Sequence, residues 1–335
     1  KFLSPFAFLR LFSPSFFGHI RAIEAFWIPC WLFAQGLALN ASCKIGRNVP
    51  PVQMFTNFKM LWNSLKRMGE LLWVSRSWLP FFNFPIPCRL PYGGWFLAYG
   101  DDTGAKIFWS ALSRYPIEEG YWKFFSRVLT SGMTFFDIGA NQGFYTILAS
   151  KRVGPQGRIF AFEPAGTELR KLKRNLLLNH CRNVTIEPQA VCHFEGFTEF
   201  HLCLDHQGSF SSIRHPARDV TARKKLIKVP VITLDAYIQR LSISSVDFIK
   251  IDVEGGELDV LKGGSLVLEK LRPIIMCEIS DIRTAPWGYQ AGEILELLHR
   301  YGYLWYSAEQ NGTLQPYLSR EYYNWENAIA IPKEK

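Results

Sequence analysis

Acidic residues stand at the ends of four apolar segments of this 335-residue chain: Asp137, Glu163, Asp252 and Glu278. Runs such as "TFFDI" and "FAFE" are typical of strands buried in a parallel sheet. Ligands of open α/β sheets bind at the carboxyl ends of the strands. We therefore expect these four carboxylates to meet at one ligand site.

The first acid opens a short loop, "DIGANQG", in which Gly139 and Gly143 are four residues apart. A dinucleotide-binding loop has the pattern G-x-G-x-x-G, and its middle glycine lets the backbone approach a pyrophosphate. This loop has no middle glycine, and no Gly-Lys-Ser/Thr follows it as in a phosphate-binding loop. Asp137 would repel a phosphate but can accept a hydrogen bond from an ammonium group or a ribose. The loop favours a nucleoside ligand without phosphates and disfavours an NAD-dependent oxidoreductase.

The second acid supports the same ligand. Glu163 follows Gly139 by 24 positions, which is close to the spacing at which a carboxylate meets ribose hydroxyls. One carboxylate can accept from both vicinal hydroxyls. The alternative is that Glu163 only begins a turn before Pro164. The glycine loop and the acid together predict nucleoside binding.

Strands alternate with helices from about residue 116 onward, which predicts a parallel sheet covered on both faces. The last two predicted strands flank Asn311–Gly312 and form an antiparallel pair. Upstream, residues 1–80 are aromatic, basic and helix-like, and residues 81–113 read as short strands joined by turns. The predicted organisation is an N-terminal extension over residues 1–115 and one α/β domain over residues 116–335.

The first 53 residues allow three interpretations. Residues 25–43 carry no charge, but polar residues dilute their apolar character, so a membrane span is weakly supported. They could form an interfacial membrane anchor, an apolar helix packed on the protein, or non-native sequence before a start near Met54 or Met60. Peripheral membrane contact through residues 1–43 is therefore one expectation.

Composition limits the partners and the compartment. The formal charge of +9 and the pI of about 9.2 suit an acidic partner surface, although a basic solvated surface is the simpler interpretation, and no nucleic-acid-binding motif is present. The seven cysteines form no C-x-x-C pair. This usage predicts buried thiols in a reducing compartment rather than a disulfide framework or a zinc site, and hence a cytoplasmic protein.

Four segments resemble the FkbM family of S-adenosylmethionine-dependent methyltransferases: "FFDIGANQGFYT", "FAFEP", "ITLDAY" and "VDFIKIDVEGGELDVLKGG". The resemblance covers roughly residues 118–331. It implies a class I, Rossmann-like α/β fold with a doubly wound, mostly parallel seven-stranded sheet that ends in an antiparallel hairpin. It also implies S-adenosylmethionine as the cofactor.

Carried over by position, the resemblance implies roles for individual residues. The methionine part of the cofactor would lie along the loop that contains Asp137, Gly139, Ala140, Asn141 and Gly143. Glu163, followed by Pro164, would hold the ribose. Gln189 and Ala190 would approach the adenine.

Three residues are candidates for catalysis. Asp252 ends a strand at the ligand edge and could contact the cofactor or the nucleophile. Glu278 ends the next strand and is an alternative base. His206 lies in a polar loop, "LDHQGSFSSIRHPARD", and histidine is the side chain best suited to general base catalysis near neutral pH. No spacing of acids requires a divalent metal ion.

Three other acids fit helix starts, where carboxylates are favoured. Asp235 in "TLDAY" is expected to be a helix N-cap. Glu254 and Glu257 are expected to cap the helix that follows "KIDVEGGE", although Glu254 could also contribute to the site.

The resemblance implies an enzyme that transfers a methyl group to a hydroxyl of a sugar, a polyketide or another secondary metabolite. The substrate would be a small molecule or a glycan. A nucleic-acid methyltransferase would suit the positive charge, but the chain has no N-P-P-Y-type motif. The alternative is a non-catalytic, membrane-associated protein that retains the methyltransferase fold. The sequence does not indicate an oligomeric state.

Overall fold

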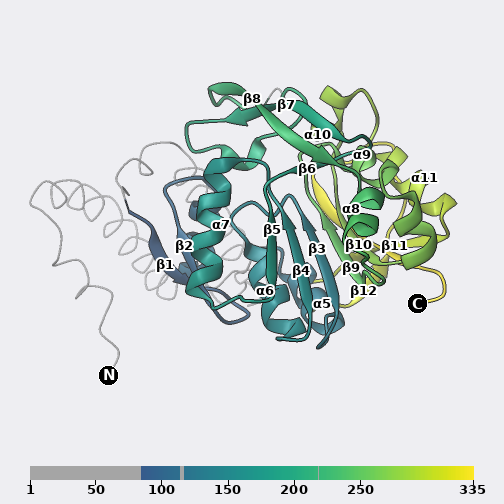
Figure 1. Ribbon diagram of the computed structural model, residues 1–335, viewed down its shortest axis with the longest axis horizontal. Coiled ribbons are helices and arrows are strands. Elements are labelled where there is room, and N and C mark those ends of the chain that lie inside the picture. The colour runs from purple at the N-terminus through teal and green to yellow at the C-terminus, as the bar shows by residue number, and fades with distance from the viewer. Residues whose placement is uncertain (1–83, 114–116, 218) are drawn as a thin grey trace, which may run out of the picture. The chain divides into compact units, whose positions relative to one another are not determined.

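The computed structural model describes residues 84–113, 117–217 and 219–335 (Figure 1). All of them belong to one compact unit, Leu72–Lys335. The expectations for residues 1–80, including a membrane contact through residues 1–43, lie outside the described residues. Within the described ranges, no helix is long and apolar enough to cross a membrane.

An eight-stranded sheet forms the centre of the fold, in the order β12-β11-β13-β10-β9-β3-β4-β5. The five strands from β10 to β5 are parallel, and β13 runs antiparallel to both β10 and β11. The strands are β3 (Thr134–Ile138), β4 (Arg158–Phe162), β5 (Val184–Glu187), β9 (Phe248–Ile251), β10 (Ile274–Ile279), β11 (Tyr303–Ala308), β12 (Leu314–Pro316) and β13 (Glu326–Pro332). The predicted Rossmann-like sheet and its antiparallel end are confirmed. The eighth strand is the three-residue β12, which extends the edge beyond the Asn311–Gly312 turn.

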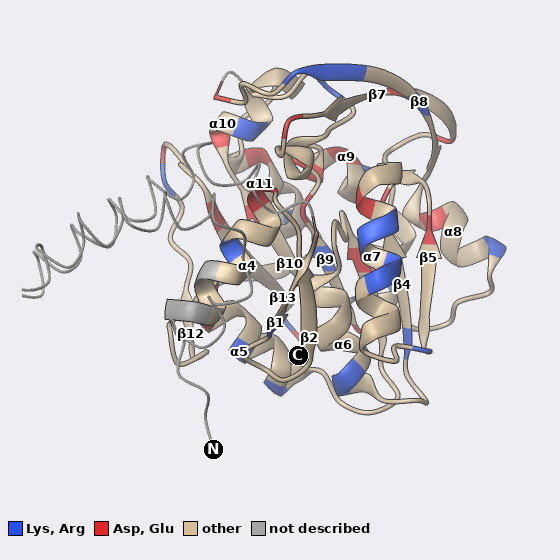
Figure 2. Cartoon of the chain, turned by 90° about the vertical axis from the view of Figure 1, so that its left-hand side faces the viewer, with Lys and Arg blue, Asp and Glu red and all other residues tan. Residues whose placement is uncertain are grey.

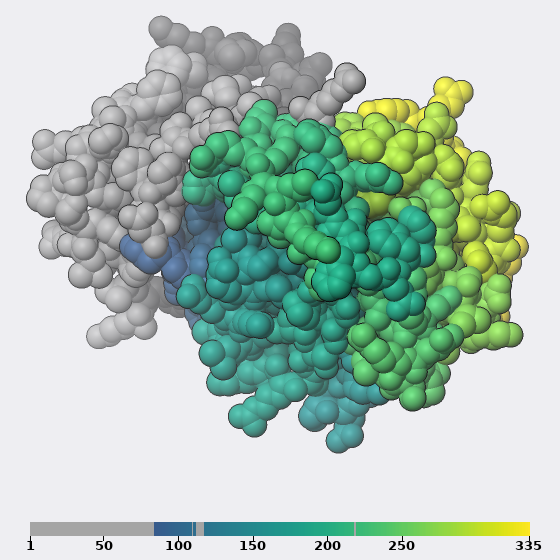
Figure 3. Space-filling view, turned by 45° about the horizontal axis from the view of Figure 1, so that its top comes forward, coloured from purple at the N-terminus to yellow at the C-terminus, as the bar shows by residue number. Residues whose placement is uncertain are grey.

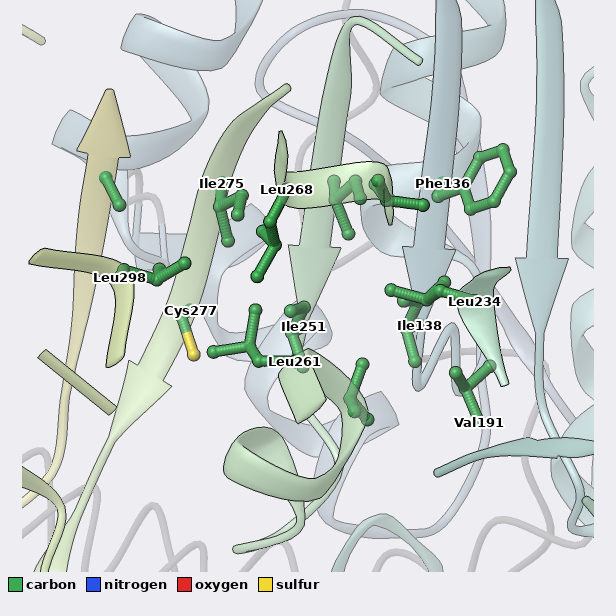
Figure 4. Close-up of a cluster of buried hydrophobic side chains, with 14 of the residues drawn as sticks. Phe136, Ile138, Val191, Leu234, Ile251, Leu261, Leu268, Ile275, Cys277 and Leu298 are labelled. Atoms are coloured by element: carbon green, nitrogen blue, oxygen red, sulfur yellow. The ribbon is translucent and has the colours of Figure 1, made fainter. Parts of the chain in front are cut away.

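Helices cover both faces of the sheet because its strands are apolar on both faces, as in β3, where every residue is buried. The helices are α5 (Glu119–Val128), α6 (Phe144–Val153) and α7 (Gly166–Leu178) on one face, and α8 (Leu234–Arg240), α9 (Glu257–Lys262) and α11 (Gly292–Arg300) on the other. Successive residues of β3 point to opposite faces of the sheet and belong to two separate hydrophobic cores. Phe135 packs with α5 and α6 in the first core, and Phe136 packs with α8 in the second. Figure 4 shows the second core, where Leu234 and Leu261 approach the sheet.

The segment before α5 departs from the expectation of short strands up to residue 113. Strands β1 (Ile86–Arg89) and β2 (Trp95–Ala98) form the expected hairpin, but residues 102–113 form helix α4 (Asp102–Ser113). The "DDTG" stretch is a helix cap and not a strand turn, because Asp101 Oδ1 accepts a hydrogen bond from the Gly104 amide at 2.8 Å. The predicted domain boundary near residue 116 stays a prediction.

A smaller sheet lies at the carboxyl ends of the central strands (Figure 1). It consists of β6 (Ala190–Val191), β8 (Lys224–Ile232) and β7 (Gly196–Cys203), in the order β6-β8-β7. The stretch coloured blue beside the β7 and β8 labels in Figure 2 marks basic residues, and atoms of this part of the chain are among the green ones in Figure 3. Lys225 and Lys228 are exposed, as expected for a solvated face. The inner side of this sheet covers the edge where the strand-end acids lie.

Short helical turns complete the chain: η3 (Gly208–Phe210), η4 (Val267–Leu271), α10 (Asp281–Thr284) and η5 (Ala285–Trp287). Asp235 contacts one of these turns, η4, and the prediction that it is the N-cap of its own helix is wrong. The N-cap of α8 is Thr233, whose Oγ1 accepts from the Ala236 amide at 3.1 Å. Asp235 instead accepts from the amides of Leu266 and Val267 at 3.0 and 3.1 Å. It ties α8 to the turn at η4, a contact between segments that local sequence cannot indicate.

Candidate active site

A cavity of about 190 Å³ lies at the carboxyl ends of β3, β4, β9 and β10. Most residues predicted for the site line it: Asp137, Gly139, Ala140, Asn141, Glu163, Pro164, Gln189, Ala190, Asp252 and Glu278. The four strand-end acids thus surround one space, as expected from the positions of the strands in the sheet.

The loop after β3 is fixed by backbone contacts on both sides. The amides of Gly139 and Ala140 donate to the Phe162 carbonyl at 3.0 and 2.9 Å, which ties the loop to β4. Gly139 has a φ of 81°, and a Cβ there would lie 1.8 Å from the carbonyl oxygen of Asp252. Only glycine allows this approach between the loops after β3 and β9. Gly143 does not line the cavity; it is the N-cap of α6 and lies against Leu172.

Asp137 presents an acceptor without a partner. Its side chain is buried, and its Oδ2 accepts a hydrogen bond from the Thr146 hydroxyl. No residue described in the structure donates to its Oδ1. Burial raises the pKa of Asp137, although the nearby Lys250 ammonium opposes this shift. A buried acceptor of this kind normally has a donor, and a ligand ammonium in the cavity could supply one.

Glu163 is held beside the same loop. Its Oε2 accepts from the Asn141 amide at 2.9 Å, and its Oε1 accepts from the Ala165 amide at 2.8 Å. Each oxygen has a second lone pair that can accept from a ligand hydroxyl. Burial raises the pKa of Glu163 to about 8, and the two amide donors oppose this shift.

The side chain of Gln142 fixes the loop after β3 to two neighbouring segments. Its buried amide nitrogen donates to Asp101 Oδ2 at 2.9 Å and to Glu168 Oε2 at 3.0 Å. Lys171 joins both carboxylates, at 2.6 and 2.8 Å. These contacts connect the loop to the start of α4 and to α7, so the segment before residue 116 helps to position the site.

Three carboxylates lie together on the other side of the cavity. Oxygen atoms of Asp252, Glu254 and Glu278 are within 4.8 Å of one another. Lys250 Nζ lies 2.9 Å from Asp252 Oδ2, and Arg283 Nε lies 3.1 Å from Glu254 Oε2. Carboxylate oxygens suit a hard divalent ion, but two of these three acids already have a protein cation. The set therefore does not require a metal ion.

Glu278 is the member of this set without an ion pair among the described residues. Its Oε1 accepts from the Trp325 indole, and its Oε2 accepts no hydrogen bond from the described part of the chain. Burial, together with the neighbouring carboxylates, raises the pKa of Glu278 well above its ordinary value. A buried carboxyl group with a free oxygen and a raised pKa is suited to proton transfer.

The two acids expected to cap α9 have different environments. Glu257 Oε1 accepts from the amides of Val253 and Gly255 at 3.0 and 3.2 Å, so it caps the turn before the helix. Glu254 has a φ of 57°, pairs with Arg283 and lines the cavity. The alternative in which Glu254 contributes to the site is therefore the one that agrees with the geometry.

His206 is not brought to the cavity. It is exposed, and its backbone carbonyl accepts from the Asp102 amide at 2.9 Å. The loop around it does reach the site, through Gly208, Ser209 and Phe210. The polar character of the loop was informative, but it did not indicate which residue faces inward.

Sequence reasoning missed several lining residues: Thr103, Lys106, Glu118, Lys250, Trp287 and Trp325. Lys250 had a usable signal, since it is a charged residue within the apolar strand "FIKI". Burial lowers the pKa of a lysine, but the Asp252 and Asp137 carboxylates outweigh this effect and raise the pKa of Lys250. The others come from separate segments that only folding brings to the cavity.

Comparison with known proteins identifies the family. The model of the methyltransferase FkbM domain matches residues 137–304, which is half of the chain. The chain belongs to the FkbM methyltransferase family. The match begins at Asp137 and includes Glu163, Asp252 and Glu278, so the four strand-end acids all lie in the FkbM domain.

Two curated relatives match parts of the chain. The AMB antimetabolite synthetase AmbE of Pseudomonas aeruginosa is 25% identical over an alignment of 208 residues, gaps included, and the alignment covers 52% of this chain and 10% of that protein. Methyltransferase 1 of Beauveria bassiana is 29% identical over an alignment of 146 residues, gaps included, and the alignment covers 38% of this chain and 56% of that protein. The chain thus spans a tenth and about half of the lengths of these relatives.

Solved structures include a methyltransferase FkbM from Methylobacillus flagellatus, with 18% identity and a TM-score of 0.37. The alignment covers 60% of this chain and 43% of that one.

The buried acids of the FkbM domain predict a stability that falls as pH rises. Burial raises the pKa values of Glu163 and Glu254 to about 8, and that of Glu257 to about 7. Between pH 5 and 8 the folded state therefore holds protons that the unfolded state has released, so rising pH destabilises the fold. We expect the melting temperature of the ligand-free protein to fall over this range in scanning calorimetry. Glu163→Gln should make the fall shallower, and a flat or rising profile would contradict these raised pKa values.

Proposed function

We propose that this chain is an S-adenosylmethionine-dependent methyltransferase that acts on a hydroxyl of a sugar, a polyketide or another secondary metabolite. The observation that carries the proposal is the unpartnered Asp137 Oδ1 beside a glycine turn, with Glu163 at the end of the neighbouring strand. S-adenosylmethionine has an ammonium group for the first acid and a ribose diol for the second. A dinucleotide would bring a pyrophosphate to a loop that carries an acid and no middle glycine.

The cofactor would lie across the carboxyl ends of β3 and β4. Asp137 and the backbone from Gly139 to Asn141 would contact its methionine part, and Glu163 would accept from the ribose hydroxyls. Gln189 and Ala190 follow β5 and line the same cavity, where they would contact the adenine. Gln189 donates to Glu187 Oε2 at 2.9 Å, which fixes its side chain for this role.

The acceptor would bind beside Asp252, Glu254 and Glu278, between Trp287 and Trp325. When bound, S-adenosylmethionine supplies a methyl carbon activated by the sulfonium. The residues at this end of the cavity would orient the acceptor hydroxyl toward that carbon, exclude water and take the hydroxyl proton, while the thioether formed from the cofactor would be the leaving group.

Glu278 is the base that the geometry favours. Its Oε2 has no hydrogen-bond partner among the described residues, and its raised pKa makes its ionised form a stronger base than an ordinary carboxylate, whereas Asp252 is paired with Lys250 and His206 lies outside the cavity. Asp252 would then act with Lys250 to position the acceptor or the cofactor. A metal ion is not needed in this scheme, because Lys250 and Arg283 already compensate two of the three acids.

Glu278→Gln tests the proposed reaction. The amide keeps the side-chain volume and the oxygen that accepts from Trp325, but it cannot take a proton. We expect methyl transfer to fall about a hundredfold or more, while the affinity for S-adenosylmethionine changes less than threefold. The measurement is transfer of a labelled methyl group to a panel of sugars, polyketides and lipids, with binding followed by calorimetry. The exposed Glu195→Gln is the control.

Two outcomes would count against the proposal. Turnover that Glu278→Gln leaves unchanged would remove Glu278 as the base. Cofactor binding without transfer to any member of the panel would favour the non-catalytic protein that retains the methyltransferase fold.

A further inference from the structure

A cysteine, a histidine and an aspartate converge at a site separate from the cavity. Cys192 Sγ lies 3.6 Å from His193 Nδ1 and 3.9 Å from Asp259 Oδ2, and His193 Nδ1 lies 3.2 Å from the same oxygen. None of these residues lines the proposed cofactor cavity. The cluster was not predictable from the sequence, because Asp259 is 67 positions after Cys192.

The backbone brings the three residues together and holds them. Cys192 and His193 follow β6, and Asp259 lies on α9, which is near β6 in Figure 1. The Cys192 amide donates to the Ile232 carbonyl at 3.0 Å. At the end of α9, a Cβ on Gly263 would lie 2.2 Å from the Cys192 carbonyl oxygen. This close approach of helix and turn requires glycine at position 263.

The separations of the three ligand atoms suit a tetrahedral zinc ion. Zinc binds sulfur at about 2.3 Å and nitrogen or oxygen at about 2.0–2.1 Å. Tetrahedral angles then place sulfur about 3.5–3.6 Å from either light atom, and nitrogen about 3.3 Å from oxygen. The structure has 3.6 and 3.9 Å for sulfur and 3.2 Å for nitrogen to oxygen. Only the sulfur–oxygen separation exceeds the tetrahedral value, by a few tenths of an ångström.

The site is closed on the cysteine side and open on the other. Cys192 is buried, whereas the side chains of His193 and Asp259 are 47% and 17% exposed. An ion could enter from solvent and keep a water as its fourth ligand. Without an ion the same three groups form a hydrogen-bonded triad, in which the Cys192 thiol donates to Asp259 Oδ2 and lies beside His193 Nδ1; an ion would replace the thiol proton and bind the same three atoms. The Phe194 ring packs edge-on against the imidazole and limits its rotation.

We propose that Cys192 Sγ, His193 Nδ1 and Asp259 Oδ2 bind a zinc ion or a similar divalent transition metal, with water as the fourth ligand. Binding converts the thiol to a thiolate and releases its proton to solvent. The ion joins the turn after β6 to α9 and acts as a clip between them. Ala190 and Val191 on one side, and Glu254 and Gly256 on the other, line the cavity, so the clip holds two of its walls together. The proposal does not depend on the reaction proposed above.

Cobalt(II) is the probe, because a bound thiolate gives it a near-ultraviolet charge-transfer absorption that oxygen and nitrogen ligands do not produce. The untagged full chain is stripped with a chelator and titrated with cobalt, and the cobalt is then displaced by zinc. We expect one cobalt per chain with the thiolate absorption. Zinc should raise the melting temperature, since it binds the folded state.

Variants locate the ion. Cys192→Ser should abolish the charge-transfer absorption, and His193→Gln and Asp259→Asn should each weaken cobalt binding at least tenfold. Cys181→Ser, at a partly buried cysteine elsewhere in the fold, should change nothing. Absence of the absorption in the wild type, or its persistence in Cys192→Ser, would overturn the proposal. If Cys192→Ser does not fold, the half-exposed His193→Gln decides: unchanged affinity would also overturn it.

Discussion

Replacing Glu163 by glutamine is expected to weaken the binding of S-adenosylmethionine at least a hundredfold. Above the pKa of about 8 that burial gives it, Glu163 is a carboxylate, which would accept from the ribose hydroxyls while it accepts from the amides of Asn141 and Ala165. Each hydrogen bond to a charged group contributes about 1.5–3 kcal/mol. Glutamine has the same size, but it loses the charge and turns an NH₂ group toward one set of donors. A hundredfold loss corresponds to about 2.7 kcal/mol.

The measurement is isothermal titration calorimetry on the wild type, Glu163→Gln and the exposed control Glu195→Gln. The control should bind like the wild type, and circular dichroism should show both variants to be folded. Equal affinities for Glu163→Gln and the wild type would mean that Glu163 only shapes the loop, as the turn before Pro164 would require.

Gly139→Ala is expected to destabilise the domain by about 3 kcal/mol or more. A Cβ at this position would lie 1.8 Å from the Asp252 carbonyl oxygen, and the φ of 81° disfavours any side chain. Strain in a left-handed backbone alone costs about 1–3 kcal/mol. The clash adds to this, because it is with backbone and no side chain can move to relieve it. The melting temperature should fall by roughly 5–10 °C.

Gly166→Ala provides the matched control. Gly166 begins α7, its φ is not positive, and a Cβ there meets no atom within 4 Å. Alanine at a helical position should leave the stability unchanged or raise it by up to about 1 kcal/mol. Equal melting temperatures for Gly139→Ala and Gly166→Ala, measured by scanning calorimetry, would show that the loops after β3 and β9 are not pressed together as described.

The strand-end acids were predictable because one physical rule links sequence to position. An apolar run that ends in a carboxylate predicts a buried strand, and parallel strands share a carboxyl edge. Asp137, Glu163, Asp252 and Glu278 therefore had to meet if the runs formed one sheet, and they line one cavity. The alternation of strands and helices predicted the central sheet, and the two strands flanking Asn311–Gly312 predicted its antiparallel end.

Features that depend on contacts between distant segments were not predictable. The "DDTG" stretch is compatible with a strand turn and with a helix N-cap. In the structure Asp101 caps the helix and also contacts Gln142 and Lys171, which lie far away in the sequence. Asp235 caps a turn some thirty residues later. The Cys192 cluster depends on the packing of α9 against the turn after β6. In each case the partner is chosen by tertiary packing and not by neighbouring sequence.

Titration of the wild-type chain with S-adenosylmethionine, and separately with NAD, tests the central claim most directly. The claim is that the cavity beside residues 139–142 takes a nucleoside-bearing methyl donor and excludes a pyrophosphate. We predict a micromolar dissociation constant for S-adenosylmethionine, about −8 kcal/mol, and no measurable heat with NAD. Absence of S-adenosylmethionine binding, or NAD binding of equal strength, would contradict the account.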